Sequence, residues 1–186
     1  MIKYNSPVIL TFSLICTLVF VLDRYLGMPI MQYFLVGNHI QWSNPLSVPT
    51  LFTHAIGHGT IQHLLGNLTF ILLLGPIIEE KYGSLNTLMM MFATALITGI
   101  LNVTFFDVGL YGASGIVFML ILLAPFTNST DGKIPLTFIL VAILFLGKEI
   151  KESLADDQVS QFAHIIGGLC GAAFGFLGRK RRKTDY

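Results

Sequence analysis

The chain has 186 residues, of which 54% are hydrophobic and only 11% are charged, and its formal net charge is +1. Soluble domains carry about 25% charged residues, so this composition excludes an ordinary soluble protein and predicts an integral membrane protein. The nearly neutral charge argues against a nucleic-acid partner. The length suits about six membrane helices of roughly 20 residues, in a single domain over residues 1–186.

Windows without Asp, Glu, Lys or Arg predict where the chain crosses the membrane. The long window from Tyr25 to Ile78 holds one helix rather than two, because Asn and Pro residues break its first half and leave an extracytoplasmic loop over about residues 28–59. The window 134–147 is the shortest and needs its flanking lysines to snorkel. We therefore predict an all-α bundle of six transmembrane helices, over about residues 6–26, 60–80, 86–106, 114–127, 134–149 and 159–178.

Basic residues predict the orientation of this bundle. The tail over residues 179–186 contains five Lys and Arg residues, whereas the first loop, from Met28 to Thr60, contains none. Positively charged residues close to membrane spans stay on the cytoplasmic side. We therefore expect a multi-pass protein of the plasma (inner) membrane with both termini in the cytoplasm.

The stretch YGASGIVF, residues 111–118, places Ser114 at the start of the fourth span with Gly112 and Gly115 beside it. A span of about fourteen residues measures only roughly 21 Å against about 30 Å for the hydrocarbon core, so Ser114 should lie below the outer surface. Small residues at this point fit two interpretations. They let helices pack closely, or they form a turn that exposes a nucleophilic hydroxyl, which then needs a base.

Polar side chains are costly in hydrocarbon, so those in or beside the predicted spans are candidates for function. Because the second, fourth and sixth spans all begin on the outer side, their first turns share one depth. His63 and Asn67 lie four residues apart, on one face of the second span. The other candidates are His54 and His58, just before that span, and His164, early in the sixth.

His164 can supply the base that Ser114 needs, as in serine hydrolases. Gly167 and Gly171, spaced as GxxxG one turn beyond His164, should let the fourth and sixth spans approach closely. No carboxylate lies at this depth, although Asp107 in the preceding loop could orient a histidine. The pattern therefore predicts a catalytic dyad of Ser114 and His164.

The oxyanion formed in such a reaction also needs hydrogen-bond donors. Asn67 and His63 carry side-chain donors on the correct face of the second span. The backbone N–H of Ser114 adds a third, because the first N–H groups of a helix have no intrahelical partner. We therefore predict these three groups at the oxyanion.

Other interpretations use only some of these residues. His54 and His58 could bind a metal if they were helical, but the neighbouring glycines and the lack of an HExxH motif favour structural hydrogen bonds. His63 and His164 could be the axial ligands of a haem, but that role makes no use of Ser114. A protein of this kind could also bind membrane clients without cutting them. We expect no metal ion and no other cofactor.

Three motifs resemble those of the rhomboid intramembrane serine proteases. GASG at 112–115 resembles the family's GxSG, and AHIIGGLCG at 163–171 resembles its AHxxGxxxG. The His and Asn residues between positions 54 and 67 match its pattern HxxxHxxxxHxxxN. In addition, EEKYGS at 79–84 resembles the family's turn after the second helix.

The resemblance implies a six-helix serine endopeptidase that cuts transmembrane protein substrates within the lipid bilayer. A peptide bond in an intact helix is shielded, so the substrate must first unwind locally, at a cost that a wet cavity can offset. Cleavage should therefore fall near the outer end of the substrate's span. On this interpretation Ser114 is the nucleophile, His164 is the base, and His63 and Asn67 stabilise the oxyanion.

Two positions differ from the pattern of many members. Phe118, one turn after the serine, replaces a tyrosine that stacks on the catalytic histidine, and phenylalanine keeps the stacking face without the hydroxyl. In the first loop, Trp42 is followed by Ser43 where many members have a Trp-Arg pair. Neither change removes a chemical group that the reaction requires.

Overall fold

The computed structural model describes residues 4–41, 43–128, 133–153 and 158–181, which form helices joined by loops. Trp42 and residues 182–186 of the basic tail lie outside the described residues. In the described ranges, β pairing is confined to an isolated antiparallel bridge between Val36 and Leu110. The helices are α1 (Pro7–Arg24), α2 (Thr50–Thr53), α3 (Ile61–Tyr82), α4 (Ser84–Phe105), α5 (Ser114–Leu123), α6 (Leu136–Ser153) and α7 (Gln158–Arg181), with 3-10 turns η1 (Met31–Tyr33), η2 (Pro45–Ser47), η3 (His54–Ile56) and η4 (Ala124–Phe126).

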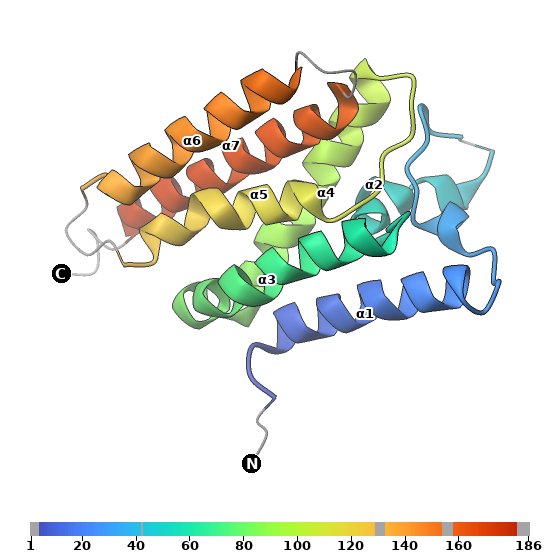
Figure 1. The fold of residues 1–186 in the computed structure, drawn as a ribbon, viewed down its shortest axis with the longest axis horizontal. Coiled ribbons are helices and arrows are strands. Elements are labelled where there is room, and N and C mark those ends of the chain that lie inside the picture. Colours follow the sequence, from blue (N-terminus) through green and yellow to red (C-terminus); the bar gives the residue numbers. More distant parts are fainter. Residues whose placement is uncertain (1–3, 42, 129–132, 154–157, 182–186) are drawn as a thin grey trace.

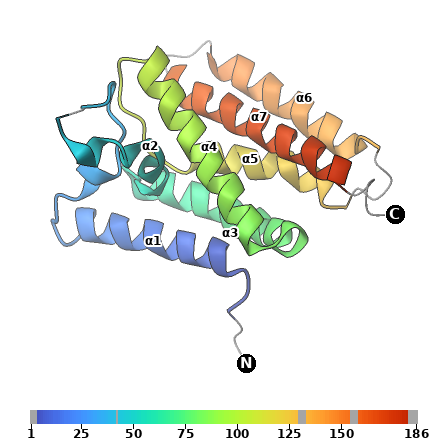
Figure 2. The ribbon, with the colours of Figure 1, turned by 180° about the vertical axis from the view of Figure 1, so that it is seen from behind.

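The helices pack around α5, which lies in the middle of the bundle (Figure 1). α3 and α7 lie along its two sides, α1 runs beside α3, and α6 lies on the outer side of α7. α4 crosses the bundle behind α5, as the reverse view shows (Figure 2). α1 begins and α7 ends towards one end of the bundle, and α2 and the first loop lie at the other end (Figure 1).

The lengths of the helices match those of membrane spans. Among the described residues, α1, α3, α4 and the part of α7 from Gln161 to Gly178 are long and apolar enough to cross a membrane. The chain is therefore an integral membrane protein, as predicted. Each predicted span coincides with a helix, with boundaries that differ by up to four residues. The number of crossings stays a prediction, because α5 and η4 together form only a short apolar segment, Ser114–Phe126, and α6 is not among these four helices.

The first loop contains short helical turns, whereas the sequence predicted an irregular chain broken by Asn and Pro. α2 and the turns η1, η2 and η3 all lie within it. Val36 also pairs with Leu110, in the loop before α5, through two backbone hydrogen bonds of 3.0 and 2.9 Å. This pairing joins segments far apart in the sequence, so no local pattern indicates it. It fastens the first loop to the segment that leads into Ser114.

After Ser114, α5 is apolar and is mostly buried within the protein. Met119 at its centre is fully buried, which is the position that a helix apolar on every side requires. The backbones of α5 and α7 lie in contact, because a Cβ atom added at Gly167 or Gly171 would collide with the backbone of Gly115 or Met119. The predicted close packing through these two glycines is therefore confirmed.

Glu79, near the end of α3, caps the N-terminus of α1. Its buried carboxylate accepts hydrogen bonds from the backbone N–H groups of Val8 (3.1 Å) and Ile9 (3.0 Å) and from the hydroxyl of Ser84 (2.7 Å). The first N–H groups of a helix have no intrahelical partner, and the helix dipole favours a negative charge there. Ser6, in the N-cap position, makes no side-chain cap. Glu79 therefore joins α1 to the corner between α3 and α4.

Replacing Glu79 with alanine should lower the free energy of unfolding by about 2–4 kcal/mol, because the change removes a cap and leaves buried donors unpaired. Glu80 is exposed and gives a matched control, and Glu80→Ala should stay close to wild type. Unfolding of both variants in detergent micelles, followed by circular dichroism, measures the difference. Equal stability of the two variants would show that the cap is dispensable.

Candidate active site

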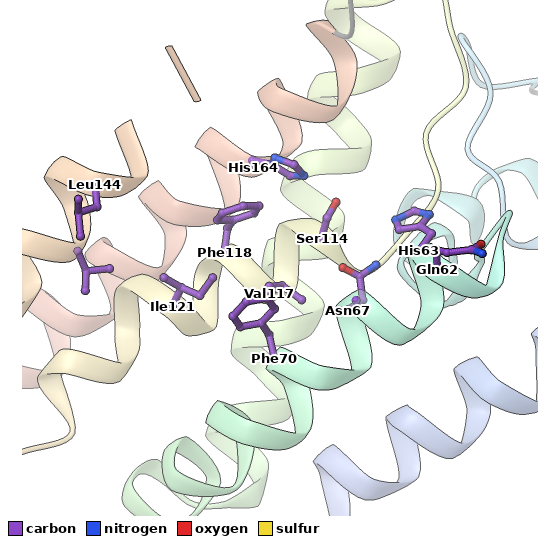
Figure 3. Close-up of a pocket in the computed structure, with 12 residues that line it drawn as sticks. Gln62, His63, Asn67, Phe70, Ser114, Val117, Phe118, Ile121, Leu144 and His164 are labelled. Atoms are coloured by element: carbon purple, nitrogen blue, oxygen red, sulfur yellow. The ribbon is translucent and has the colours of Figure 1, made fainter. Parts of the chain in front are cut away.

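Four helices, α3, α5, α6 and α7, contribute side chains to one cavity of about 540 Å³. Ser114 begins α5, His164 lies on α7, and His63 and Asn67 lie one turn apart on α3. Figure 3 shows Ser114 between His164 on one side and Asn67 and His63 on the other. The structure thus brings together the four side chains that spacing placed at one depth, while their chemical roles stay predictions.

Gly112 makes the turn that presents Ser114. Its φ of +118° lies in a region that residues with a side chain rarely adopt. A Cβ atom at this position would also lie 2.5 Å from Cε1 and 2.7 Å from Nε2 of His63. The backbone N–H of Gly112 donates to the carbonyl oxygen of His54 at 2.9 Å, which fastens the turn to the first loop. Both the backbone conformation and the adjacent imidazole therefore require glycine here.

The imidazole of His164 stacks on Phe118, with ring centroids 4.2 Å apart and 40° between the ring planes. Phe118 lies one turn after Ser114, so a single helix supplies both the hydroxyl and the aromatic face beside the histidine (Figure 3). α7 also packs against Gly115, where a Cβ atom would lie at an ordinary contact distance of 3.5 Å from the carbonyl oxygen of Ala163. The prediction that phenylalanine keeps the stacking face is confirmed.

His58 holds the side-chain amide of Asn67. The amide Nδ2 lies 3.0 Å from Nε2 of His58, and Nδ1 of His58 lies 3.0 Å from the carbonyl oxygen of Ile56. Because a carbonyl oxygen only accepts, Nδ1 carries the hydrogen and Nε2 accepts from Asn67. The amide has a second N–H for another acceptor. His58 therefore fixes which way the amide faces.

Burial lowers the pKa of His58 from 6.5 to about 4, an effect that the hydrogen bond to Ile56 reduces and the neighbouring His63 increases. As the pH falls, His58 in the unfolded chain therefore takes up a proton at a higher pH than His58 in the folded protein. The free energy of unfolding should be highest above pH 6.5 and should fall as the pH drops toward 4. In thermal unfolding at pH 7 and pH 5, His58→Gln should lose less stability on acidification than wild type, and the exposed control His39→Gln should behave like wild type. An unchanged dependence in His58→Gln would contradict this assignment.

His54, the second buried histidine of the first loop, also makes structural hydrogen bonds. Its Nε2 lies 3.0 Å from the carbonyl oxygen of Ala95, and its own carbonyl oxygen accepts from Gly112. Burial lowers the pKa of His54, which keeps the ring neutral near pH 7. In the described part of the chain, no three His, Cys, Asp or Glu side chains come together as metal ligands. His54 and His58 both make hydrogen bonds within the protein, as the sequence led us to expect, and their role in function stays a prediction.

Sequence spacing identified neither Tyr111 nor the apolar walls of the cavity. The ring of Tyr111 lies 6.1 Å from that of His63, which also meets the ring of His58 edge-on at 5.0 Å. The available signal was an aromatic residue directly before Gly112. The apolar walls come from α3, α5 and α6, namely Phe70, Val117, Ile121, Val141 and Leu144.

A family model described as the Rhomboid domain matches residues 45–181 of the chain. The chain belongs to the rhomboid family. This rhomboid is similar to the Rhomboid protease GlpG of Haemophilus influenzae, with 25% identity over 136 residues that cover 72% of this chain and 71% of that protein. It is also similar to the Rhomboid protease GlpG of Klebsiella pneumoniae subsp. pneumoniae, with 26% identity over 193 aligned residues that cover 97% of this chain and 68% of that protein.

The matched region of this rhomboid contains every residue that lines the cavity, from Gln62 on α3 to His164 on α7. The family that the motifs suggested is therefore confirmed, and the named relatives within it are proteases. Asp107, considered as a third catalytic group, lies exposed in the loop between α4 and α5.

Proposed function

We propose that this rhomboid is an intramembrane serine endopeptidase with Ser114 as nucleophile and His164 as general base. The observation that supports this function most directly is the meeting of these two side chains with His63 and Asn67 in one cavity. Ser114 Oγ attacks the carbonyl carbon of the substrate, and its proton passes to His164. The C–N bond then breaks as His164 returns the proton to the leaving amine, and water hydrolyses the acyl-enzyme by the same steps.

The negative oxygen that forms during the attack needs donors already in place. We assign this role to the second N–H of Asn67, the imidazole of His63 and the backbone N–H of Ser114 at the start of α5. The packing of His63 against Gly112 supports this role over haem ligation, because Nε2 lies close to the backbone and leaves no room for a haem on that nitrogen.

Transmembrane protein substrates would reach this cavity from the bilayer, between α3 and α6. Phe70 on α3 and Leu144 on α6 both line the cavity and are 44% and 73% exposed. Apolar side chains at the mouth suit a substrate segment that arrives from hydrocarbon. The polar groups lie farther in, on α3, α5 and α7, where the unwound part of the substrate can replace its lost hydrogen bonds.

The topology that we propose has six crossings, by α1, α3, α4, α5, α6 and α7, in one membrane domain over residues 1–186. α1 begins and α7 ends towards the same end of the bundle, which suits an even number of crossings (Figure 1). The five basic residues of the tail place that end in the cytoplasm by the positive-inside rule and the first loop outside the plasma membrane.

Cleavage should fall near the outer end of the substrate's span, because Ser114 lies towards that side of the proposed topology. Each backbone group left unpaired in hydrocarbon costs several kcal/mol, so helix-weakening residues in the substrate should speed the reaction. A glycine weakens a helix by about 1 kcal/mol, so each glycine replaced by leucine should slow cleavage up to about fivefold. The test uses purified protein in liposomes with a single-span substrate, and mass spectrometry of the product termini.

Ser114→Ala provides the negative control for this assay. Products cut near the cytoplasmic end of the span, or rates that are indifferent to the substrate glycines, would contradict the proposed position of the site. A wild-type protein that binds the single-span substrate and never cuts it would instead favour the interpretation as an inactive, client-binding rhomboid.

A further inference from the structure

A second cavity, of about 420 Å³, lies between α1 and α4, and Ile116 of α5 also lines it. We name it the α1–α4 groove. Its walls are apolar except for Thr11, whose hydroxyl is paired with that of Tyr4 at 3.0 Å. None of its lining residues is charged. Representative lining residues are Val8, Thr11 and Ile15 on α1 and Leu88, Met91 and Ala95 on α4.

The groove runs along the helices and is closed at one end. Its lining residues on α1 extend from Pro7 to Ile15, which corresponds to about 12 Å of helix. Phe52 of α2 and the segment Ala55–Ile56 of η3 close the end toward the first loop. Figure 2 shows α2 between α1 and α4 at this end. The lining residues therefore extend along about 12 Å of α1 and end against α2 and η3.

The side of the groove is open to the surroundings of the protein. Ile15 is 40% exposed, Leu88 51% and Phe92 46%, and all three line the groove. Since α1 and α4 are both long and apolar enough to cross a membrane, these side chains face hydrocarbon. Whatever fills the groove must therefore come from an apolar medium.

We propose that the α1–α4 groove binds one fatty acyl chain of a bilayer phospholipid. Water is a poor occupant, because it needs two to four polar partners and the walls are apolar. A transmembrane substrate helix is the alternative occupant, and displacement of bound lipid by a single-span substrate would reveal it. An extended acyl chain has the required apolar surface, and its contacts replace the dispersion energy that an empty groove would lose.

The closed end of the groove touches residues that hold the catalytic turn. Ala95 lines the groove, and its carbonyl oxygen is the partner of His54 Nε2 at 3.0 Å. The carbonyl oxygen of His54 in turn accepts from the N–H of Gly112 at 2.9 Å. Ile116, two residues after Ser114, forms part of the same wall. The end of a bound acyl chain therefore packs directly behind the turn that presents the serine.

Photolabelling tests this assignment without any use of proteolysis. The protein is reconstituted in phosphatidylcholine liposomes that contain a phospholipid with a diazirine near the end of one acyl chain, irradiated, digested and mapped by mass spectrometry. We expect the strongest label at the closed end, on Ala55, Ile56 and Met91. Ser114→Ala should be labelled like wild type, so a failure of the proposed protease function would leave this result unchanged.

Two variants that fill the groove from opposite walls provide the contrast, Thr11→Trp from α1 and Leu88→Trp from α4. Label at the closed end should fall in both to the level of other lipid-facing positions, whereas Leu14→Trp, on the lipid-exposed side of α1 and outside the groove, should leave it unchanged. Thermal unfolding checks that each variant is folded. The proposal would be overturned if the closed end of the wild-type groove were labelled no more strongly than exposed Leu14, or if the label persisted in both folded filling variants. It would also be overturned if a single-span substrate displaced the label and excess phospholipid did not.

Discussion

Ser114→Ala and His164→Ala should each abolish cleavage of a single-span substrate while leaving the protein folded. Removal of the nucleophile or of the base in a soluble serine protease lowers kcat by a factor on the order of 10⁶, and the two groups act as a unit. The double variant should therefore be no slower than either single variant. Product formation in liposomes measures the rates, and thermal unfolding in detergent confirms the fold.

The matched controls for the dyad are a serine and a histidine outside the cavity. Ser13 lies buried in α1, where its hydroxyl donates to the carbonyl oxygen of Ile9, and His39 lies exposed in the first loop. Ser13→Ala and His39→Ala should retain cleavage at the same bond. Near wild-type turnover at that bond in Ser114→Ala or His164→Ala would end the dyad hypothesis.

Asn67→Ala should lower kcat by about 10²–10³ with little change in KM, because loss of one oxyanion donor costs this much in a comparable serine hydrolase. The amide of Asn67 lies beside Ser114 and is oriented by His58 at 3.0 Å. A donor that acts only on the developing negative charge changes the transition state and leaves substrate binding as it was. Steady-state kinetics over a range of substrate densities in liposomes separates the two parameters.

A second asparagine gives the control for this experiment. Asn86 is exposed on α4, where its amide donates to the carbonyl oxygen of Tyr82, and Asn86→Ala should keep the wild-type kcat. If KM rises and kcat holds in Asn67→Ala, Asn67 is a packing or binding residue, and the oxyanion must be stabilised by the other two groups.

Much of the fold could be predicted from the sequence, because hydrocarbon imposes a simple rule on composition. Windows without charge mark the helices, and the short span predicted over residues 114–127 already indicated a helix that begins within the membrane. The meeting of Ser114 with His164 and Asn67 followed from the depth at which their helices begin. The close approach of α5 and α7 followed from the spacing of Gly167 and Gly171.

The contacts that could not be predicted all join segments whose sequences carry no common helical repeat, so no pattern places those segments side by side. The backbone pairing of Val36 with Leu110 uses N–H and C=O groups that every residue carries, so no residue type signals it. The bond from Asn67 to His58 requires the loop to fold back against α3, which depends on turns that the Asn and Pro residues left undetermined. Tyr111 and the apolar walls were missed because apolar residues are ordinary in membrane helices.

The cap that Glu79 supplies to α1 has a consequence for how the protein is made. The carboxylate and the N–H of Val8 that it binds are separated by 71 positions along the chain. Because the chain is synthesised from its N-terminus, α1 enters the bilayer well before Glu79 has been synthesised. We expect α1 to remain unpacked in the membrane during this interval. It should pack against α3 only after the corner between α3 and α4 has left the ribosome. A nascent chain stalled before that corner would therefore hold its first helix untethered.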